Sequence, residues 1–377
     1  MKVQPIRCPG TDRPSWLVLG DDFLPIEPIR AYLAFRECLG RSPNTIRSDA
    51  HHLKLYWEYL RDVRLDWASI GVEHLAHFIT WLRRGDPLLA TLEQPARRTD
   101  ATIDQILTAV HTFYDFHARA GTVPDLQLHQ FVTMPNRRYR SFLHGIVKTK
   151  PVRTRLVRLK PEHRRPKVLT QGQVQDLLAA CTRTRDRFLV ALVYDTGMRI
   201  GQALGLRHAD IAVESGAVRI VPRDNNANGA RSKSATVVTV FPSQAVLELY
   251  ITYLVEDLDG LAADQLPDYV FVNLWGGDVG RPMTYAAARS LFARLERRVA
   301  TAAGVSVHIT PHMLRHTRAT AWIRDDKLPT STVARLLGHT SVQTTDAIYT
   351  HLADEDVRAA LEAAQGRRRG QGGGQDG

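Results

Sequence analysis

A long basic segment in the middle of the chain sets the main limit on how the sequence can fold. Residues 137–167 contain twelve Lys or Arg residues, one acidic residue, Glu162, and three prolines. The prolines disfavour a long helix, and the charge run lies between two segments with globular patterning. For a chain of 377 residues, this predicts two globular domains joined by a basic linker over residues 121–167. The basic residues are Arg137, Arg138, Arg140, Lys148, Lys150, Arg153, Arg155, Arg158, Lys160, Arg164, Arg165 and Lys167.

The part of the chain before the linker is patterned for helices. Residues 1–22 carry three prolines and no clear periodicity, so we predict an irregular N-terminal arm. Over residues 23–120, apolar residues recur at helical spacings. Ser42 and Pro43 form a helix-start signal, with Ser42 as the N-cap and Pro43 at the first helical position. We expect helices over residues 28–35, 43–60, 74–83 and 102–120, in a bundle of four or five helices.

The part after the linker mixes helices with a few strands. Thr170 and Gln173 fit a capping box at the start of a helix, and a second helix over residues 185–195 stops at Gly197. Strand-like runs at 217–222 and 235–241 flank a Gly/Asn-rich stretch, which predicts a β-hairpin with a long tip. Residues 269–274 are a candidate third strand. Further helices are predicted at 284–302, 313–324, 331–337 and 354–364, followed by a disordered low-complexity tail at 366–377.

The composition narrows the class of partner and the compartment. A formal net charge of +11 favours nucleic acid or an acidic membrane surface as partner. No apolar run approaches the roughly 18 residues that span a bilayer, and the N-terminus lacks the apolar stretch of a secretory signal. The three cysteines are widely spaced without a CxxC motif, which indicates neither a disulfide framework nor a zinc site. We therefore expect an intracellular protein with no bound metal.

Two interpretations of the basic linker stay open. It could lie along a phosphate backbone, where each neutralised phosphate releases counterions and so strengthens binding. The alternative is a plain solvated connection between the two domains.

Five short motifs in the second domain carry residue types suited to phosphate chemistry. Each has an ordinary interpretation when taken alone, such as an Arg after a helix end or a half-buried Tyr. His312 and Arg315, three residues apart, share one helical face. The motifs follow the order Arg, Lys on the hairpin tip, HxxR, Gly-His and Tyr. The residues are Arg199, Lys233, His312, Arg315, His339 and Tyr349.

In this order, the sequence resembles the tyrosine recombinase, or phage integrase, family. The stretches TGMRIGQALGL, ARSKSATVVTV, HMLRHTRAT and LLGHTSVQTTDAIYTHL carry the resemblance over residues 168–365. The helical segment with SPNTIRSDAHHLKLYWEYL resembles the family's core-binding domain. The resemblance implies a mainly α fold with a small β-sheet. A helical, SAM-like core-binding domain would occupy residues 23–120, and an α+β tyrosine-recombinase catalytic domain residues 168–365.

The resemblance also implies a reaction and a role for each motif residue. Tyr349 would attack a DNA phosphodiester and form a 3′-phosphotyrosine intermediate. Arg199 and Arg315 would neutralise the non-bridging oxygens through bidentate hydrogen bonds. Lys233 would be the general acid for the departing 5′ oxygen.

His312 and His339 would hydrogen-bond the phosphate, with His312 a candidate acceptor for the phenolic proton. The covalent link conserves the bond energy, so the reaction would require neither ATP nor a metal, and no cofactor is expected.

The sequence departs from the family pattern in three places. Gly201 and Gln202 stand where relatives usually have Ser-Glu, so the acidic residue that braces the active site in relatives is absent. Tyr349 follows His339 by ten residues, one more than in many members, a spacing often seen in transposon-borne relatives. Arg231 competes with Lys233 as the hairpin cation, and Lys233 is favoured because Arg does not readily give up a proton.

The expected substrate is double-stranded DNA, held between the two domains. The family implies a tetramer on two DNA sites, with a dimer at each, acting in integration, excision or transposition of a mobile element. Helix 354–364 would pack on a neighbouring protomer or on its own domain. The protein is expected in the cytoplasm, associated with the nucleoid and not with a membrane. The predicted DNA contacts are Arg137, Arg138, Arg140, Lys148, Lys150, Arg153, Arg155, Arg164, Arg165 and Lys167.

Two other functions remain as alternatives. A catalytically inactive DNA-binding accessory protein would explain the charge, but all six catalytic positions hold competent residues. A type IB topoisomerase shares the chemistry, but the helical N-terminal segment resembles that of integrases.

Overall fold

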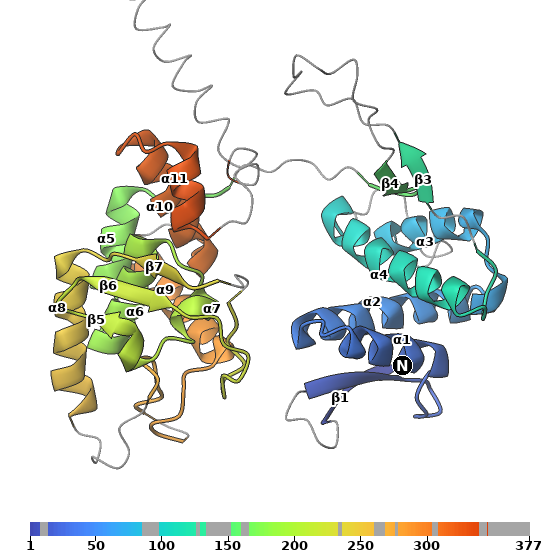
Figure 1. Cartoon of the computed structure of the whole chain (residues 1–377), viewed down its shortest axis with the longest axis horizontal. Coiled ribbons are helices and arrows are strands. Elements are labelled where there is room, and N and C mark those ends of the chain that lie inside the picture. The colour runs from blue at the N-terminus through green and yellow to red at the C-terminus, as the bar shows by residue number, and fades with distance from the viewer. Residues whose placement is uncertain are drawn as a thin grey trace, which may run out of the picture. The chain divides into compact units, whose positions relative to one another are not determined.

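A computed structural model gives the structure of the chain (Figure 1). It divides into two compact units, unit 1 (Met1–His163) and unit 2 (Arg164–Gly377), and each is described by itself. No described helix is both long and apolar enough to cross a membrane. The structure describes residues 1–7, 14–84, 98–125, 129–132, 152–159, 166–232, 236–259, 268–275, 278–303, 308–338 and 345.

Unit 1 is built around helices that begin where the sequence predicts. Ser42 Oγ accepts a hydrogen bond from Thr45 N (3.2 Å), and Pro43 is the first residue of its helix. Both observations confirm the predicted helix start. The helices are α1 (Glu27–Cys38), α2 (Pro43–Asp62), the 3₁₀ turn η1 (Trp67–Ser69), α3 (Val72–Arg84) and α4 (Asp100–Arg119).

Aromatic side chains fill the core of unit 1. Tyr56 and Tyr114 are almost fully buried, and their hydroxyl oxygens lie 2.9 Å apart. The Tyr114 hydroxyl also donates to the carbonyl of Trp67 (2.8 Å), which ties η1 to α4. Tyr56 meets the ring of Phe78 edge-on at 5.0 Å. Such pairs add roughly 0.5–1.5 kcal/mol each to the burial of the rings.

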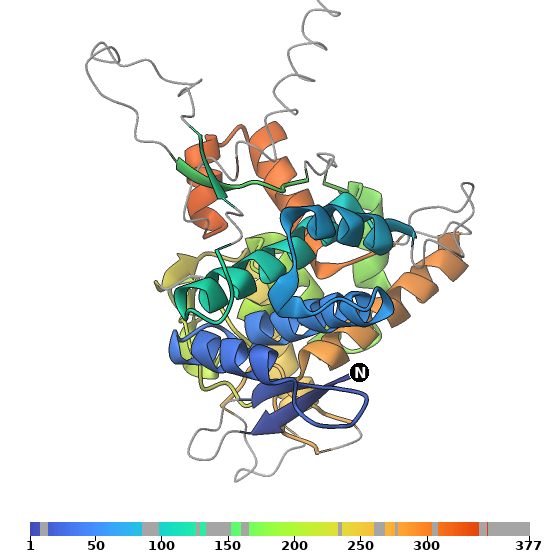
Figure 2. The same cartoon turned by 90° about the vertical axis from the view of Figure 1, so that its right-hand side faces the viewer.

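The predicted irregular arm at residues 1–22 is wrong, because the described part of this segment is a β-hairpin. Strand β1 (Lys2–Arg7) pairs antiparallel with β2 (Pro14–Leu19). Val18 is buried in the core of unit 1, and the hairpin lies against α1 and α2 (Figures 1 and 2). Both strands of a two-stranded sheet are edge strands, where proline is tolerated, so the prolines did not exclude a strand here.

The predicted linker also contains structure of its own. Strand β3 (His129–Val132) pairs antiparallel with β4 (Val152–Arg155). Arg155 donates to Asp104 Oδ2 (2.9 Å) on α4, and Leu159 N donates to Asp104 Oδ1 (3.2 Å). Val157 and Leu159 pack against the core of unit 1. Residues 152–159 are therefore fixed to the helical unit, and the division between the units falls after His163.

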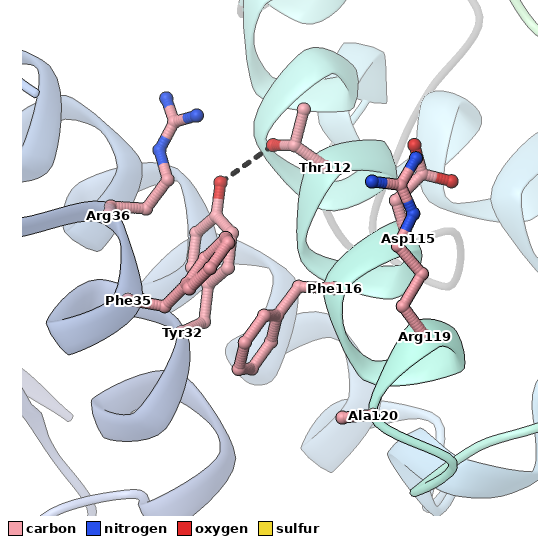
Figure 3. A pocket seen from close by; sticks show the side chains of 8 residues that line it. All are labelled: Tyr32, Phe35, Arg36, Thr112, Asp115, Phe116, Arg119 and Ala120. Atoms are coloured by element: carbon pink, nitrogen blue, oxygen red, sulfur yellow. Dashed lines mark hydrogen bonds between the residues drawn. The ribbon is translucent and has the colours of Figure 1, made fainter. Parts of the chain in front are cut away.

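A hollow of about 490 Å³ lies between α1 and α4 (Figure 3). Phe35 and Phe116 stack at 4.8 Å, and the Tyr32 hydroxyl lies 2.7 Å from Thr112 Oγ1. It contains none of the residues predicted for catalysis. The lining residues are Tyr32, Phe35, Arg36, Thr112, Asp115, Phe116, Arg119 and Ala120.

Unit 2 is an α+β unit that contains a small antiparallel sheet. Thr170 and Gln173 form the predicted capping box at the start of α5. The sheet has the order β5-β6-β7 and comprises β5 (Ile211–Ala212), β6 (Ala217–Ile220) and β7 (Val238–Val240). The larger helices are α5 (Gln171–Ala179), α6 (Thr184–Thr196), α8 (Gln244–Tyr253), α9 (Tyr285–Ala303), α10 (Pro311–Arg324) and α11 (Thr330–Leu336). The short elements are α7 (Ile200–Ala203), the 3₁₀ turn η2 (His208–Asp210) and the π-helical turn η3 (Leu254–Leu258).

Helix α6 is the centre of unit 2 and contacts α5, α7, α8 and α10. It is buried on nearly every side, as the unbroken apolar run from Phe188 to Val193 requires. Helices α10 and α11 lie side by side at one end of the unit (Figure 1).

The predicted hairpin is confirmed, since β6 pairs antiparallel with β7. The candidate third strand at residues 269–274 is wrong, because the third strand of the sheet is β5. Val270, Phe271 and Val272 are fully buried, but their segment makes only isolated bridges, to Arg207 and Pro282. Its backbone bonds go to loops instead, for example from Val270 N to Leu206 O (3.0 Å). The predicted helix 354–364 and the tail lie outside the described residues.

Asp104 holds residues 152–159 on α4, so we predict that Asp104→Ala releases this segment. Trypsin should then cleave wild-type protein slowly and the variant rapidly after Arg155 or Arg158, as read by mass spectrometry under native conditions. Glu58→Ala is the matched control, since it breaks an ion pair with Lys54 (2.7 Å) inside α2 alone. Equal cleavage of the two variants after Arg155 and Arg158 would contradict the anchoring role of Asp104.

Candidate active site

The turn between α6 and α7 positions Arg199. Helix α6 ends at Gly197, which has a left-handed backbone (φ +62°). A Cβ on this residue would lie 3.2 Å from both Leu337 and Trp322, so glycine is required by the space as well as by the backbone. Arg199 follows as the N-cap of α7, and its backbone N donates to Gln202 Oε1 (2.8 Å).

Arg315 joins this turn to the end of α11. Its side chain is 4% exposed. Nη1 donates to the carbonyl of Gly197 and Nη2 to the carbonyl of Leu337, both at 2.7 Å. Charge-assisted bonds of this length are strong, and a fork of N–H groups suits two carbonyls better than an ammonium does. Arg315 therefore contacts the turn at Gly197, two residues before Arg199.

The guanidinium of Arg199 differs from that of Arg315 in its hydrogen bonding. Its Nη1 atom is buried and has no hydrogen-bond partner among the described residues. Burial lowers the pKa of the Arg199 guanidinium. A buried cationic N–H without an acceptor is costly and rare in folded proteins, and it marks a position where an anion would be stabilised.

His312 and His316 stand on the same helix as Arg315. His312 is exposed in the first turn of α10, whose N-cap Thr310 accepts from Met313 N (3.3 Å). His316 is half-buried, and its pKa is lowered first by desolvation and then by the charges of His312 and Arg315. The three side chains therefore lie within electrostatic range of one another on α10, although they differ in exposure. The sequence motif contained His316, but we predicted no role for it.

The loop between β6 and β7 is folded over its described part, residues 223–232, which we call the tip loop. Arg223 makes a bidentate pair with Asp210 (2.7 and 2.8 Å) at its base. Asn228 Nδ2 donates to the carbonyls of Leu204 (2.9 Å) and Met283 (2.8 Å). The tip loop is thus tied to the body of unit 2 at its base and at its middle.

The tip loop ends beside α7. Gln202 Nε2 donates to Ser232 Oγ (3.4 Å), and the Gly201 backbone lies close to the carbonyl of Arg231. The absent acidic residue is therefore replaced by an amide that contacts both Arg199 and the loop. Gln202 stands three residues after the N-cap residue Arg199, the position from which a Gln side chain reaches back to the N-cap N–H, and this spacing was the sequence signal that could have identified it.

Of the six predicted catalytic residues, the structure describes Arg199, Arg315 and His312. Lys233, His339 and Tyr349 lie outside the described residues. The described chain stops at Ser232, one residue before Lys233, and at Gly338 (φ +62°), which follows the C-cap of α11 and precedes His339.

Among the predicted DNA contacts, the structure describes the side chains of Arg155 and Lys167. Arg155 is engaged with Asp104 and with Thr108 Oγ1 (2.7 Å), so its guanidinium is committed to α4. Lys167 is exposed. The structure describes the backbone of Arg153 but not its side chain. The others lie outside the described residues: Arg137, Arg138, Arg140, Lys148, Lys150, Arg164 and Arg165.

Comparisons with known proteins identify the family. A family model described as "Phage integrase family" matches residues 167–356, and one described as "Phage integrase, N-terminal SAM-like domain" matches residues 31–121. Transposase A from transposon Tn554 of Staphylococcus aureus is 32% identical over 361 residues, which cover 95% of this chain and 96% of the relative. Tyrosine recombinase XerD of Mycobacterium tuberculosis is 27% identical over 344 residues, covering 88% and 94%.

A solved structure shares the fold. The Tn1549 transposon integrase, in complex with a circular intermediate DNA, superposes with a TM-score of 0.59 at 14% identity, covering 89% of this chain and 99% of that one. The expected fold class, a helical SAM-like domain followed by an integrase catalytic domain, is confirmed. The chain therefore belongs to the phage integrase family and is a tyrosine-type DNA recombinase.

Proposed function

We propose that this recombinase cleaves and rejoins DNA at specific sites to move a transposon-like element, using Arg199 and Arg315 around the scissile phosphate and Tyr349 as nucleophile. The observation that carries the proposal is the buried Nη1 of Arg199, which has no partner among the described residues. A phosphodiester oxygen is an acceptor of the right charge and size for this N–H. The unmatched donor in the free protein then becomes a preorganised contact in the complex.

Arg315 supports the same site from behind. Its bonds to the Gly197 and Leu337 carbonyls fix the turn that carries Arg199 and the end of α11, from which the chain continues to His339 and Tyr349. Rigid support of this kind allows two charged groups and a nucleophile to act on one phosphorus atom.

The proposed reaction uses only groups of this chain. Tyr349 Oη forms a bond to phosphorus as the P–O5′ bond breaks, and His312 takes the phenolic proton. Lys233 donates a proton to the departing 5′ oxygen, while His339 hydrogen-bonds the phosphate. The 3′-phosphotyrosine is later attacked by a 5′ hydroxyl, which restores a phosphodiester without ATP.

The relatives support DNA as the substrate and a mobile element as the setting. One is a transposase of a transposon, and the Tn1549 integrase was solved with a circular intermediate DNA. We propose the same substrate class here, with a dimer on each DNA site and a tetramer for strand exchange. A protein with this activity would be found with the nucleoid.

We further propose that the basic segment contacts phosphates, except for Arg155. The ion pair with Asp104 fixes Arg155 on α4. Exposed Lys167 and its basic neighbours along the chain would instead follow the DNA backbone, where charge and not base sequence is recognised.

Tyr349→Phe should bind DNA normally and form no covalent product, since only the phenolic oxygen can attack. We would incubate both proteins in EDTA with a supercoiled plasmid carrying the gene's own flanking DNA, and quench with SDS. Adduct and recombinant plasmid from wild type alone are expected. An adduct from Tyr349→Phe would refute the nucleophile assignment, relaxed plasmid without recombinants would favour a topoisomerase, and binding without adduct an accessory protein.

Arg199→Ala and Arg315→Ala should differ in stability although both slow cleavage. Arg199→Ala removes a donor that is unmatched, so the free energy of unfolding should stay within about 1 kcal/mol of wild type or rise. Its adduct formation should fall by roughly 10²–10³-fold. Arg315→Ala leaves two buried carbonyls unpaired and should lose about 3 kcal/mol. Denaturant unfolding checks this, and equal losses of stability would count against the distinction.

Replacing Arg164, Arg165 and Lys167 together by alanine should weaken DNA binding and flatten its salt dependence. The slope of log K against log [salt] should decrease in magnitude by about 0.9 for each phosphate that the variant no longer neutralises. Affinity should fall by the same factor on an unrelated duplex of equal length, because phosphate contacts carry no sequence information. An unchanged slope in a filter-binding titration would assign these residues to a solvated linker.

A further inference from the structure

We propose that Gly201 and Gln202 are positioning residues that lock the end of the tip loop onto α7, so that Arg199 and the chain leading to Lys233 keep one relative arrangement. This inference rests on the proposed function, in which these two cations act on the same phosphate. It gives a role to the Gly-Gln pair that stands where relatives have Ser-Glu.

Gly201 sets how closely the loop approaches. A Cβ at this position would lie 3.0 Å from the carbonyl oxygen of Arg231 and 3.9 Å from its backbone N. Its backbone is not left-handed, so the short distance, and not the dihedral angle, is what requires glycine. The obstacle is main chain, which cannot rotate aside as a flexible side chain could. Any larger residue must therefore move the loop away from α7 by some tenths of an ångström.

Gln202 joins Arg199 to the end of the tip loop through one amide group. Its side chain is 5% exposed. Oε1 accepts from Arg199 N (2.8 Å), and Nε2 donates to Ser232 Oγ (3.4 Å). A glutamate could keep both hydrogen bonds, because a carboxylate would accept from Arg199 N–H and from the Ser232 hydroxyl. A leucine of similar size could form neither.

The rest of the tip loop is braced, so a shift at Arg231 is transmitted and not absorbed. Asn226 Nδ2 donates to Ala230 O (2.8 Å), and Ala227 N donates to the Tyr269 hydroxyl (2.8 Å). With Asn228 held by two carbonyls, the segment before Ser232 has little freedom to compensate. The next residue along the chain is Lys233.

The chemistry offers a way to separate a displaced general acid from a general loss of structure. In the proposed cleavage, the departing 5′ oxygen needs a proton as its bond to phosphorus breaks. In a DNA substrate with sulfur in place of that bridging oxygen, the leaving group is a thiolate. Because a thiol has an ordinary pKa of about 8.5, the thiolate can leave without taking up a proton. Such a substrate no longer depends on where Lys233 lies, but still depends on Arg199.

The test compares Gly201→Ala with wild type on both substrates, after the wild-type adduct has mapped the cleaved bond. On normal DNA, single-turnover adduct formation should fall on the order of tenfold, while DNA binding stays within about twofold. On the sulfur-bridged DNA, the rate should return to within about twofold of wild type. Gly172→Ala is the matched control, since its Cβ would meet only Thr170 Oγ1, at 4.0 Å.

Gly201→Ala cleaving normal DNA at the wild-type rate, or slowing equally on both substrates, would overturn the inference. If thermal melting shows that Gly201→Ala is unfolded, the pair Gln202→Leu and Gln202→Glu decides. The inference is supported if Gln202→Leu is slow on normal DNA and recovers on the sulfur-bridged DNA, while Gln202→Glu behaves like wild type. It is overturned if the two variants behave alike. No adduct from wild type on either DNA would overturn the proposed function, and this inference with it.

Discussion

Two hydrogen bonds of the Arg315 guanidinium join the parts of unit 2 from which the proposed active site is built. One reaches the carbonyl of Gly197 and the other that of Leu337, so a single buried fork joins α10 to the α6–α7 turn and to the end of α11. Gly197 can be placed there only because it lacks a Cβ, which would meet Leu337 and Trp322. Three helices therefore converge on one cation, and Arg199 is presented from that point.

The two arginines that we propose to act on the phosphate differ in how the folded protein holds them. The terminal nitrogens of Arg315 donate to protein carbonyls, so this guanidinium also supports the fold. Arg199 keeps a buried N–H that no described group accepts, which costs stability and, in the proposed function, prepares a contact with phosphate. Enzymes commonly carry such local cost at the site of reaction and recover stability elsewhere, here in the apolar run of α6 and the aromatic core of unit 1.

Local signals in the sequence predicted most of the helices, the β6–β7 hairpin and the family. Capping residues such as Ser42 and Thr170 act within one turn, so a sequence pattern is enough to find them. The β1–β2 hairpin was missed because its prolines were taken as evidence against strands, although edge strands tolerate proline. The anchoring of Arg155 by Asp104 was missed because the two residues lie far apart in the chain. The bridging amide of Gln202 was missed for the same reason: its second partner, Ser232, is thirty residues further along. The catalytic roles of the motif residues were predicted from the order of the motifs along the chain, and not from any single motif.

The most direct test of this account is to identify the atoms joined in the covalent protein–DNA adduct. After wild-type protein is trapped on DNA, nuclease and trypsin digestion followed by tandem mass spectrometry would locate the attached nucleotide. We predict that it lies on Tyr349, within the tryptic peptide of residues 336–358, linked through a 3′ phosphate with a free 5′ hydroxyl on the other DNA end. A nucleotide on any other residue, or a 5′ phosphate linkage, would contradict it.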